Sequence, residues 1–251
     1  GIAYHILGTS DYREPSLVTG AANYSWVYQV GNNEYDSLSQ YYKDICGFSN
    51  ATEFGQYMNE QYTNMVKSVK EYGGFYIGRY ETSLTTGTVG SQINKTPMDS
   101  RAGTETSSNT GNLWYGMYNK QDSLKNIHNP YYNSTTVVSS MIWGSQYDTM
   151  LNWALTGNEA NTVFERTGNH SGNSATTGRW GSDIINNIFD LSSNVIEWTQ
   201  QAVTASGRAC RGGYYSTTST AATNLRGSNF PTYAFSGYGS RLTLYMRSSE
   251  P

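Results

Sequence analysis

The range Asn194–Arg241 restricts the fold of this 251-residue chain more than any other stretch does. It begins with Asn-Val-Ile-Glu-Trp, and it continues into Gly213–Tyr238, 26 residues that are rich in Tyr, Ser, Thr and Asn and carry one charge, at Arg226. Glycine tolerates positive φ and the close approach of another backbone, so Gly212 and Gly213 predict a bend between the two parts. The first part has the composition of a scaffold. The second has that of a recognition surface, because paratopes combine Tyr with small polar residues.

Five residue types are absent from Gly213–Tyr238: Lys, Glu, Gln, Met and Trp, whose codons must all end in a purine. These types make up 39 of the 251 residues, so a window of 26 residues would hold roughly four of them. Their absence indicates a segment encoded by codons that end in a pyrimidine.

Three short motifs resemble the signature of the formylglycine-generating-enzyme family in order and spacing. They are Asn194–Trp198, Arg211–Gly213 and Gly239–Arg241. The strand-like sequence Gly74–Glu81, which follows a helix and a glycine, is similar to the opening of the lectin-type domain in that family. The resemblance implies a variant of the C-type lectin fold. The codon pattern of Gly213–Tyr238 also resembles the variable proteins of diversity-generating retroelements, in which adenines of AAY-type codons are randomised on such a scaffold.

The resemblance divides the segment into positions that hold the backbone and positions that contact a ligand. The first group matches the motifs and comprises Arg211, Gly212, Gly213, Arg226, Gly239 and Arg241. Tyr215 is left out of the second group, because alternation beside Tyr214 turns it toward the core. The expected ligand-contacting residues, all encodable by pyrimidine-ending codons, are Tyr214, Ser216, Thr217, Thr218, Thr220, Thr223, Ser228, Asn229, Phe230, Thr232, Tyr233, Phe235, Ser236 and Tyr238.

Asn194 and Glu197 fall at family positions that help to hold a structural calcium ion, through the oxygen ligands that a hard cation prefers. The alternative is a carboxylate that is hydrogen-bonded to backbone, with Trp198 packed below it. The residue before Asn194 is Ser193 and not the usual Gly, so no further calcium ligand is assigned. No cofactor is expected to be required.

Catalytic motifs are missing from the sequence. Oxidase members of the family bind copper through a Cys pair shortly after Arg-Gly-Gly, because thiolates are soft ligands. The range Arg211–Pro251 contains no Cys, so we expect no enzyme of this kind. The two cysteines, Cys46 and Cys210, are expected to be small buried residues and not a disulfide. The three His form no metal-binding motif, and neither Gly-x-Ser-x-Gly nor Gly-Lys-Ser/Thr occurs.

The composition narrows the choice of partners. A net charge of −3 gives no electrostatic footprint for nucleic acid. The sequence has no apolar run of 18 residues and does not begin like a signal peptide, so neither a membrane span nor a signal peptide is expected in it. Charged residues form 14% of the chain, against about 25% in ordinary globular proteins. This composition is typical of an extracellular, virion or cell-surface protein.

Two amphipathic helices are predicted. The first runs from about Thr52 to Tyr72, with Asn50 and Glu53 as a capping box and Gly73 just beyond its end. Its predicted buried face consists of Phe54, Met58, Tyr62, Met65, Val66 and Val69. The second runs from about Ser140 to Leu155 and stops at Gly157; its predicted residues are Ile142, Trp143, Gln146, Tyr147, Met150, Leu151 and Trp153.

The other regions are less regular. A strand is expected at 24–30 and another at 74–81, and 82–137 is expected to be an ordered but irregular insertion with a short helix near 114–124. These elements favour the α+β class, with two helices, small antiparallel sheets and long irregular loops. Residues 1–72 are interpreted as an N-terminal extension and first helix packed on a C-type lectin-like domain at 73–251.

The predicted function is non-catalytic binding through a hypervariable surface at about 213–238. The ligand would be a protein or carbohydrate on a cell surface. Two alternatives remain at this point: an enzyme or degenerate enzyme of the formylglycine-generating (sulfatase-modifying) family, and a structural tail or fibre component.

Overall fold

A computed structural model describes residues 33–85, 87–100, 113–155, 168–204, 207–217, 223 and 225–248. Within these residues the chain forms five helices, α1 to α5, and eleven strands, β1 to β11. The predicted strand at 24–30 and the predicted helix stop at Gly157 lie outside the described residues.

The longest helix, α3, spans Ala51–Tyr72 and agrees with the prediction. The side chain of Asn50 accepts a hydrogen bond from the Glu53 amide at 3.0 Å, as an N-cap does. The Glu53 carboxylate accepts from the Ser49 amide, one residue before the predicted partner. At the other end Gly73 has a φ of 81°, which only glycine adopts without strain. All the residues of the predicted apolar face are buried: Phe54, Met58, Tyr62, Met65, Val66 and Val69.

Helix α5 spans Gly144–Leu155, so its predicted start at Ser140 was wrong. Residues up to Met141 instead belong to strand β4, Val137–Met141, which pairs with β11. Strand pairing overrides the helical spacing there. Trp153, assigned to the buried face, is 51% exposed because this side of α5 borders a pocket.

The range 82–137 is more regular than predicted. It contains a β-hairpin, β2 (Thr82–Thr85) with β3 (Thr88–Ser91), and helix α4, Trp114–Gln121. Two short helices that were not predicted, α1 (Asn33–Asp36) and α2 (Gln40–Cys46), precede α3. Helix α4 is the short helix predicted near 114–124, so the described part of the chain has five helices where two long ones and one short one were expected.

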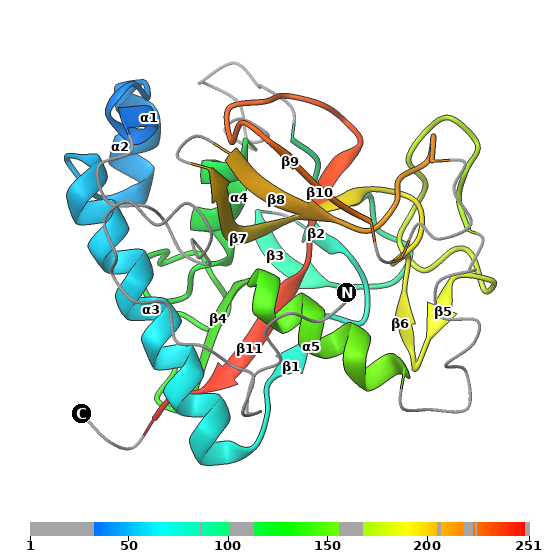
Figure 1. Ribbon diagram of the computed structural model, residues 1–251, viewed down its shortest axis with the longest axis horizontal. Coiled ribbons are helices and arrows are strands. Elements are labelled where there is room, and N and C mark those ends of the chain that lie inside the picture. The colour runs from blue at the N-terminus through cyan, green and yellow to red at the C-terminus, as the bar shows by residue number, and fades with distance from the viewer. Residues whose placement is uncertain are drawn as a thin grey trace.

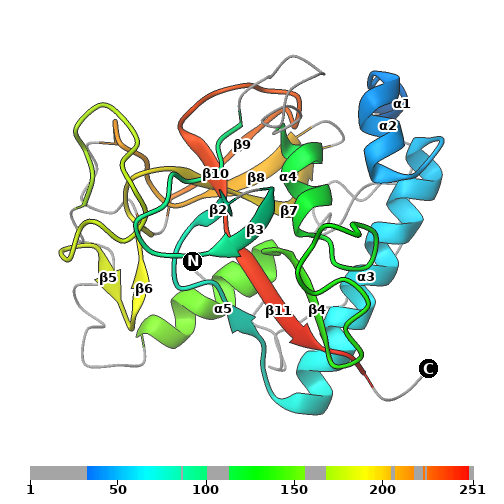
Figure 2. The same ribbon diagram turned by 180° about the vertical axis from the view of Figure 1, so that it is seen from behind.

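A three-stranded antiparallel sheet has the order β1-β11-β4. Strand β1 is Tyr76–Ile77, much shorter than the predicted 74–81, and β11 is Leu242–Met246. The last described strand therefore lies between two strands that come much earlier in the sequence. This places the end of the Asn194–Arg241 stretch beside β1 (Figure 2).

A four-stranded sheet takes all its strands from the Asn194–Arg241 stretch, in the order β10-β7-β8-β9. Its strands are β7 (Ile196–Thr204), β8 (Gly207–Arg211), β9 (Arg226–Asn229) and β10 (Tyr238–Ser240). Strands β7, β8 and β9 pair antiparallel, whereas β10 is parallel to β7. The expectation of antiparallel sheets was therefore wrong for this one pair.

Two groups of buried side chains hold these layers together. The larger one joins α3 and α4 to Trp198 of β7 and Tyr245 of β11. The smaller one joins α5 to the hairpin of β5 (Ile184–Ile185) and β6 (Ile188–Phe189). Figure 1 shows α3 along one side of the molecule and the β5–β6 hairpin at the opposite side, with the sheets between them. The architecture is mixed α+β. No helix in the described ranges is long and apolar enough to cross a membrane.

Candidate ligand-binding surface

A buried ion pair fixes the scaffold under the predicted binding segment. The Arg241 Nε atom donates to Glu197 Oε1 at 2.9 Å, and both side chains are at most 1% exposed. The same guanidinium donates to the backbone oxygens of Gly78 and Phe189, each at 2.8 Å. One side chain thus links β6 and β7 to the residue that follows β1. Buried acceptors such as these need a protein donor.

Asn194 also joins distant segments of the chain through its side-chain hydrogen bonds. It adopts a φ of 64°, and its Nδ2 atom donates to Glu81 at 2.5 Å. Its Oδ1 atom accepts from Asn169 at 3.0 Å and from the Ala175 amide at 2.7 Å. Glu81 also accepts from the Val195 amide. Burial, with the nearby acidic groups Asp190 and Glu197, raises the pKa of Glu81 well above its ordinary value.

Asn194 and Glu197, to which the family resemblance assigns calcium, both bind protein donors, and among the described residues Glu197 Oε2 has no hydrogen-bond partner. The Asn194 oxygen already accepts two N–H donors, and Glu197 Oε1 is held by Arg241. The alternative, a Glu197 carboxylate bonded to backbone, was wrong, because its partner is the Arg241 side chain. In the part of the chain that the structure describes, no three His, Cys, Asp or Glu side chains gather as metal ligands.

The Arg-Gly pair that precedes the binding segment is structural, as expected. Arg211 is buried, donates to Asp148 of α5 at 2.7 Å and lies 4.8 Å from the Tyr147 ring centroid. Gly212 has a φ of 78°, and a Cβ atom there would lie 2.5 Å from the Leu191 oxygen. Any larger residue would push two backbone segments apart. The backbone therefore bends at Gly212, between β8 and the exposed segment.

A series of aromatic rings in contact leads from the core to the surface; we call Trp198, Tyr238, Tyr233, Phe235 and Tyr214 the aromatic ladder. Tyr238 stacks on the buried Trp198 with centroids 4.5 Å apart. Tyr233 and Phe235 then contact Tyr238 at 5.7 and 5.9 Å, and Tyr214 contacts Phe235 at 5.8 Å. These separations are those of favourable edge-to-face and stacked pairs. The inner rings therefore hold the outer rings in position.

Ser100 anchors the loop that carries these rings. Its amide donates to the Tyr238 oxygen at 2.8 Å, its oxygen accepts from the Phe235 amide at 2.6 Å, and its hydroxyl donates to the Tyr233 oxygen at 2.8 Å. The amide of Trp114 donates to the Pro231 oxygen at 3.1 Å. Sequence reasoning missed Ser100, since nothing in its neighbourhood signals a contact made 133 residues away.

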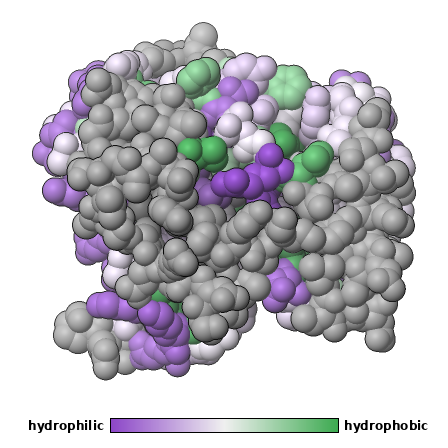
Figure 3. Space-filling model, viewed as in Figure 1, coloured by the Kyte–Doolittle hydropathy of each residue, from purple (hydrophilic) through white to green (hydrophobic). Residues whose placement is uncertain are grey.

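The predicted contact residues occupy a range of exposures. Phe230 is 58% and Tyr233 is 43% exposed. Ser216, Ser228 and Thr232 are also exposed, and the half-buried members are Tyr214, Thr217, Asn229, Phe235, Ser236 and Tyr238. In the view of Figure 3, the described residues show apolar groups in small patches separated by hydrophilic ones. Exposed rings surrounded by hydroxyl and amide groups suit adaptable recognition.

Not all the expected contact residues face solvent, and two of them lie outside the described residues. Thr223 is fully buried, so the expectation that it faces a ligand was wrong; the Tyr147 hydroxyl donates to its backbone oxygen at 3.3 Å. Thr218 and Thr220 lie outside the described residues. Tyr215 is turned inward, as predicted: it is 7% exposed, and its hydroxyl lies 3.0 Å from Ser236 Oγ. Cys46 and Cys210 are both buried and free, as predicted.

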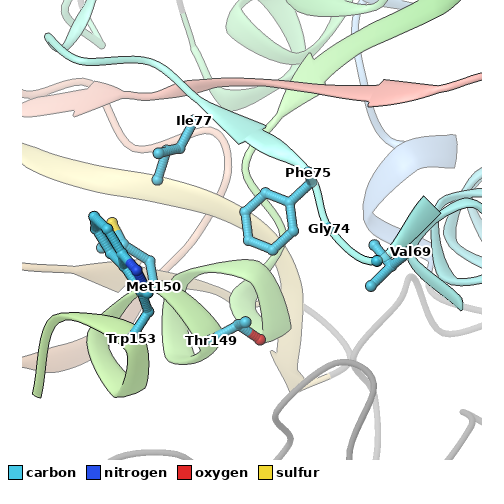
Figure 4. A pocket seen from close by; sticks show the side chains of 8 residues that line it. Val69, Gly74, Phe75, Ile77, Thr149, Met150 and Trp153 are labelled. Atoms are coloured by element: carbon cyan, nitrogen blue, oxygen red, sulfur yellow. The ribbon is translucent and has the colours of Figure 1, made fainter. Parts of the chain in front are cut away.

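A separate pocket of about 300 Å³ lies between the end of α3, β1 and α5. Phe75 and Ile77 face Met150 and Trp153 across it, and Thr149 is its polar side chain (Figure 4). None of the side chains that line the pocket is acidic or basic.

No protein-family model and no curated protein matches the chain. Among solved structures it is similar to Treponema denticola variable protein 1, at 14% identity and a TM-score of 0.33, over 94% of this chain and 78% of that one. It is also similar to the crystal structure of CarF, at 17% identity and a TM-score of 0.31, over 43% of this chain and 48% of that one. The CarF match thus spans about half of each protein. At these scores neither likeness carries an argument about ligand or activity.

Proposed function

We propose that this chain is a non-catalytic ligand-binding protein that displays a hypervariable surface on a C-type lectin scaffold of the formylglycine-generating-enzyme type. It would be the variable protein of a diversity-generating retroelement. The place of action would be outside the cell, on a virion that binds a receptor or on a cell surface, and the ligand would be a surface protein or carbohydrate.

The observation that carries this proposal is the aromatic ladder from Trp198 to Tyr233. Rings that are held by other rings lose little conformational entropy on binding, so they supply contact area at a low entropic cost. The ladder stands on a scaffold of motif residues, Glu197, Arg211 and Arg241, which form buried ion pairs inside the protein. The segment therefore combines a rigid base with exposed side chains that can change without disturbing it.

A variant with five alanine substitutions tests whether the exposed side chains can change without disturbing the base. The replaced residues are the most exposed of the expected contact residues: Ser216, Ser228, Phe230, Thr232 and Tyr233. We expect each change to alter stability by less than about 0.5 kcal/mol, as at other surface sites. Binding to peptides selected from a displayed random library, or to an immobilised glycan array, should be lost.

The matched control replaces Thr52, Gln56 and Lys67 by Ala, which are exposed on α3. This variant should bind as the wild type does. Unfolding of the five-site variant, or binding that survives in it, would contradict the proposal.

The encoding DNA tests the retroelement part independently. We expect a near-copy of the segment for Gly213–Tyr238 close to the gene, differing from it only opposite adenines, and a neighbouring reverse-transcriptase gene. A locus without both would refute the retroelement origin and leave the binding test unaffected.

A further inference from the structure

A group of basic side chains lies outside the aromatic ladder, around the β5–β6 hairpin and the loop that follows β3. In the described ranges 74–96 and 168–193, Arg79 and Arg179 are exposed and Lys95 is half-buried. All the acidic side chains of these ranges are buried: Glu81, Asp183 and Asp190. The exposed charge here is therefore positive, although the whole chain has a net charge of −3.

Backbone hydrogen bonds bring the segments that carry these cations together. The amide of Thr177, two residues before Arg179, donates to the Lys95 oxygen at 2.8 Å. The Phe189 amide donates to the Arg79 oxygen at 2.9 Å, so the segment after β1 lies beside β6. The three cations thus stand on neighbouring segments, although they are far apart in the sequence.

The centre of the group is apolar. A Cβ atom on Gly178 would lie 2.5 Å from Tyr80 Cε1 and 3.1 Å from Ile93 Cγ1, so both side chains pack at this glycine. Ile93 is 48% exposed. An apolar centre with a polar rim is the usual anatomy of a protein–protein interface. We define the basic patch as Arg79, Lys95 and Arg179 together with Tyr80 and Ile93.

The Arg79 guanidinium is held in place with one edge still available. Its Nε and Nη2 atoms donate to the backbone and side-chain oxygens of Asn187, each at 3.0 Å. Its Cζ atom lies 5.5 Å from the Phe189 ring centroid and 5.9 Å from that of Tyr80, within the range of cation–π contacts. A guanidinium has five N–H donors. The edge formed by Nη1 and Nη2 can therefore still bind a carboxylate in a bidentate manner.

The other two cations add charge to the same surface. Arg179 lies over the Trp180 ring, with its Cζ atom 5.7 Å from the centroid. Neither Arg79, Lys95 nor Arg179 forms an ion pair with another described residue. An acidic partner would therefore meet three positive charges that no carboxylate of the described chain compensates.

We propose that the basic patch binds an acidic segment of a partner protein, with a carboxylate on the open edge of Arg79 and an apolar side chain against Ile93. This inference goes beyond the proposed function, because no residue of the patch belongs to the predicted ligand-contacting set. Arginine clusters recognise acidic motifs through charge-assisted hydrogen bonds. Complementary charges also speed association and fix the register of the complex.

Other polyanions fit the basic patch less well. Nucleic acid is bound through many phosphate contacts, more than three cations provide. Anionic membrane surfaces attract clusters of about four to eight Lys or Arg residues. An anionic polysaccharide would pair with the cations, but it has no apolar side chain to cover Ile93. A protein segment supplies both kinds of contact.

Two successive peptide selections test the proposal. Linear peptides from a displayed random library are selected on the wild-type protein and then depleted on a variant with Arg79→Gln, Lys95→Gln and Arg179→Gln. Depletion removes peptides that bind the aromatic ladder, because the ladder is intact in this variant. We expect the remaining peptides to combine Asp or Glu with an apolar residue. The wild type should bind them about tenfold more tightly than the variant does, as for three surface ion pairs.

The matched control removes three exposed cations that lie outside the patch, through Lys67→Gln, Lys70→Gln and Lys125→Gln. It has the same net charge as the first variant and should bind the peptides as the wild type does. Raising the salt concentration from about 50 mM to about 500 mM should weaken wild-type binding, since salt screens exposed charges.

A charge reversal gives a result that does not depend on the triple variant folding. Arg179 donates no hydrogen bond to a described residue, so Arg179→Glu should leave the fold intact. We expect this variant to bind a selected peptide more weakly than the wild type does. Replacement of one acidic residue of the peptide by Lys should restore at least about a fivefold part of the loss.

Equal peptide binding by the wild type and the triple variant, or selected peptides without acidic residues, would overturn the inference. Binding of polygalacturonate or of phosphatidylserine vesicles through the patch, with no acidic peptide selected, would make a polysaccharide or a membrane the occupant instead. A wild-type dimer that the triple variant dissociates would make a second copy the occupant, contrary to the proposal. None of these outcomes affects the five-site alanine test, so the two proposals fail separately.

Discussion

Arg241 shows how one residue can join distant parts of this chain. Its guanidinium bonds Glu197 and two backbone oxygens while fully buried. Removal of one member of a buried pair leaves the other charge without compensation in a medium of low polarity. Arg241 therefore contributes to the stability of the fold.

Arg241→Ala should lower the free energy of unfolding by about 3–5 kcal/mol, as other broken buried pairs do. Glu197→Ala should be similarly destabilising. Arg179→Ala serves as the control, since Arg179 is exposed and should change stability by less than about 0.5 kcal/mol. Urea unfolding measures all three. Unchanged midpoints for both Arg241→Ala and Glu197→Ala would mean that the pair does not hold the scaffold.

Asp122, at the end of α4, gives a prediction about pH. Burial raises the pKa of its carboxyl to about 6, although the Tyr57 hydroxyl donates to it at 2.7 Å. The unfolded chain has a pKa of about 3.9 at this group. Between these values the folded protein keeps a proton that the unfolded chain has lost. Through this group, stability therefore rises as the pH falls from above 6 to about 4, by up to about 3 kcal/mol.

Asp122→Asn should remove this contribution, because an amide does not titrate in this range. We expect the difference in unfolding free energy between variant and wild type to change from pH 7 to pH 4.5, in favour of the wild type at the lower pH. Denaturant titrations at the two pH values measure it. The same difference at both pH values would show that Asp122 titrates normally.

At the scale of elements, caps and pairing partners decide where helices begin. Helix α3 starts where its sequence predicts, because Asn50 satisfies an amide of the first turn locally. Helix α5 starts later than its spacing predicts, because Ser140 and Met141 are taken into β4 by pairing with β11. A local cap can be seen in the sequence, whereas a strand partner about 100 residues away cannot.

Asn50→Ala should lower the free energy of unfolding by about 1 kcal/mol, the usual effect of a lost N-cap. Asn50→Asp retains a side-chain oxygen that accepts from the Glu53 amide and should keep most of this stability. Thermal unfolding of the two variants makes the comparison. Equal stability of the alanine and aspartate variants would show that the cap contributes nothing in this context.

At the scale of the whole molecule, the resemblance to an enzyme family raises the question of catalysis. The copper-binding Cys pair of the oxidases has no counterpart in Arg211–Pro251, and burial raises the pKa of the Cys210 thiol to about 11. A thiol held in its protonated form is a poor nucleophile and a poor metal ligand.

The purified protein should therefore not oxidise the thiol of a sulfatase-type peptide in the presence of copper and oxygen. Peptide mass spectrometry detects the aldehyde product. Turnover above that of heat-denatured protein would contradict non-catalytic binding and favour the enzyme alternative.

The codon pattern alone does not delimit the binding surface. Lys, Glu, Gln, Met and Trp are missing from all of Ala202–Tyr245, a range that includes the buried strand β8. Exposure makes the distinction instead: Phe230 and Tyr233 face solvent, whereas Thr223, with the same codon property, is buried.

The sequence by itself determined what depends on neighbours along the chain: the span and caps of α3, the glycine bend after Arg211 and the inward turn of Tyr215. Tertiary structure alone decided what depends on partners far away. Ser100 holds the ring-bearing loop, Arg241 holds Glu197, and β9 lies at a sheet edge. The physical reason is that helix caps and turns are satisfied within a few residues. Buried polar groups and strand edges take whichever partner the folded chain brings to them.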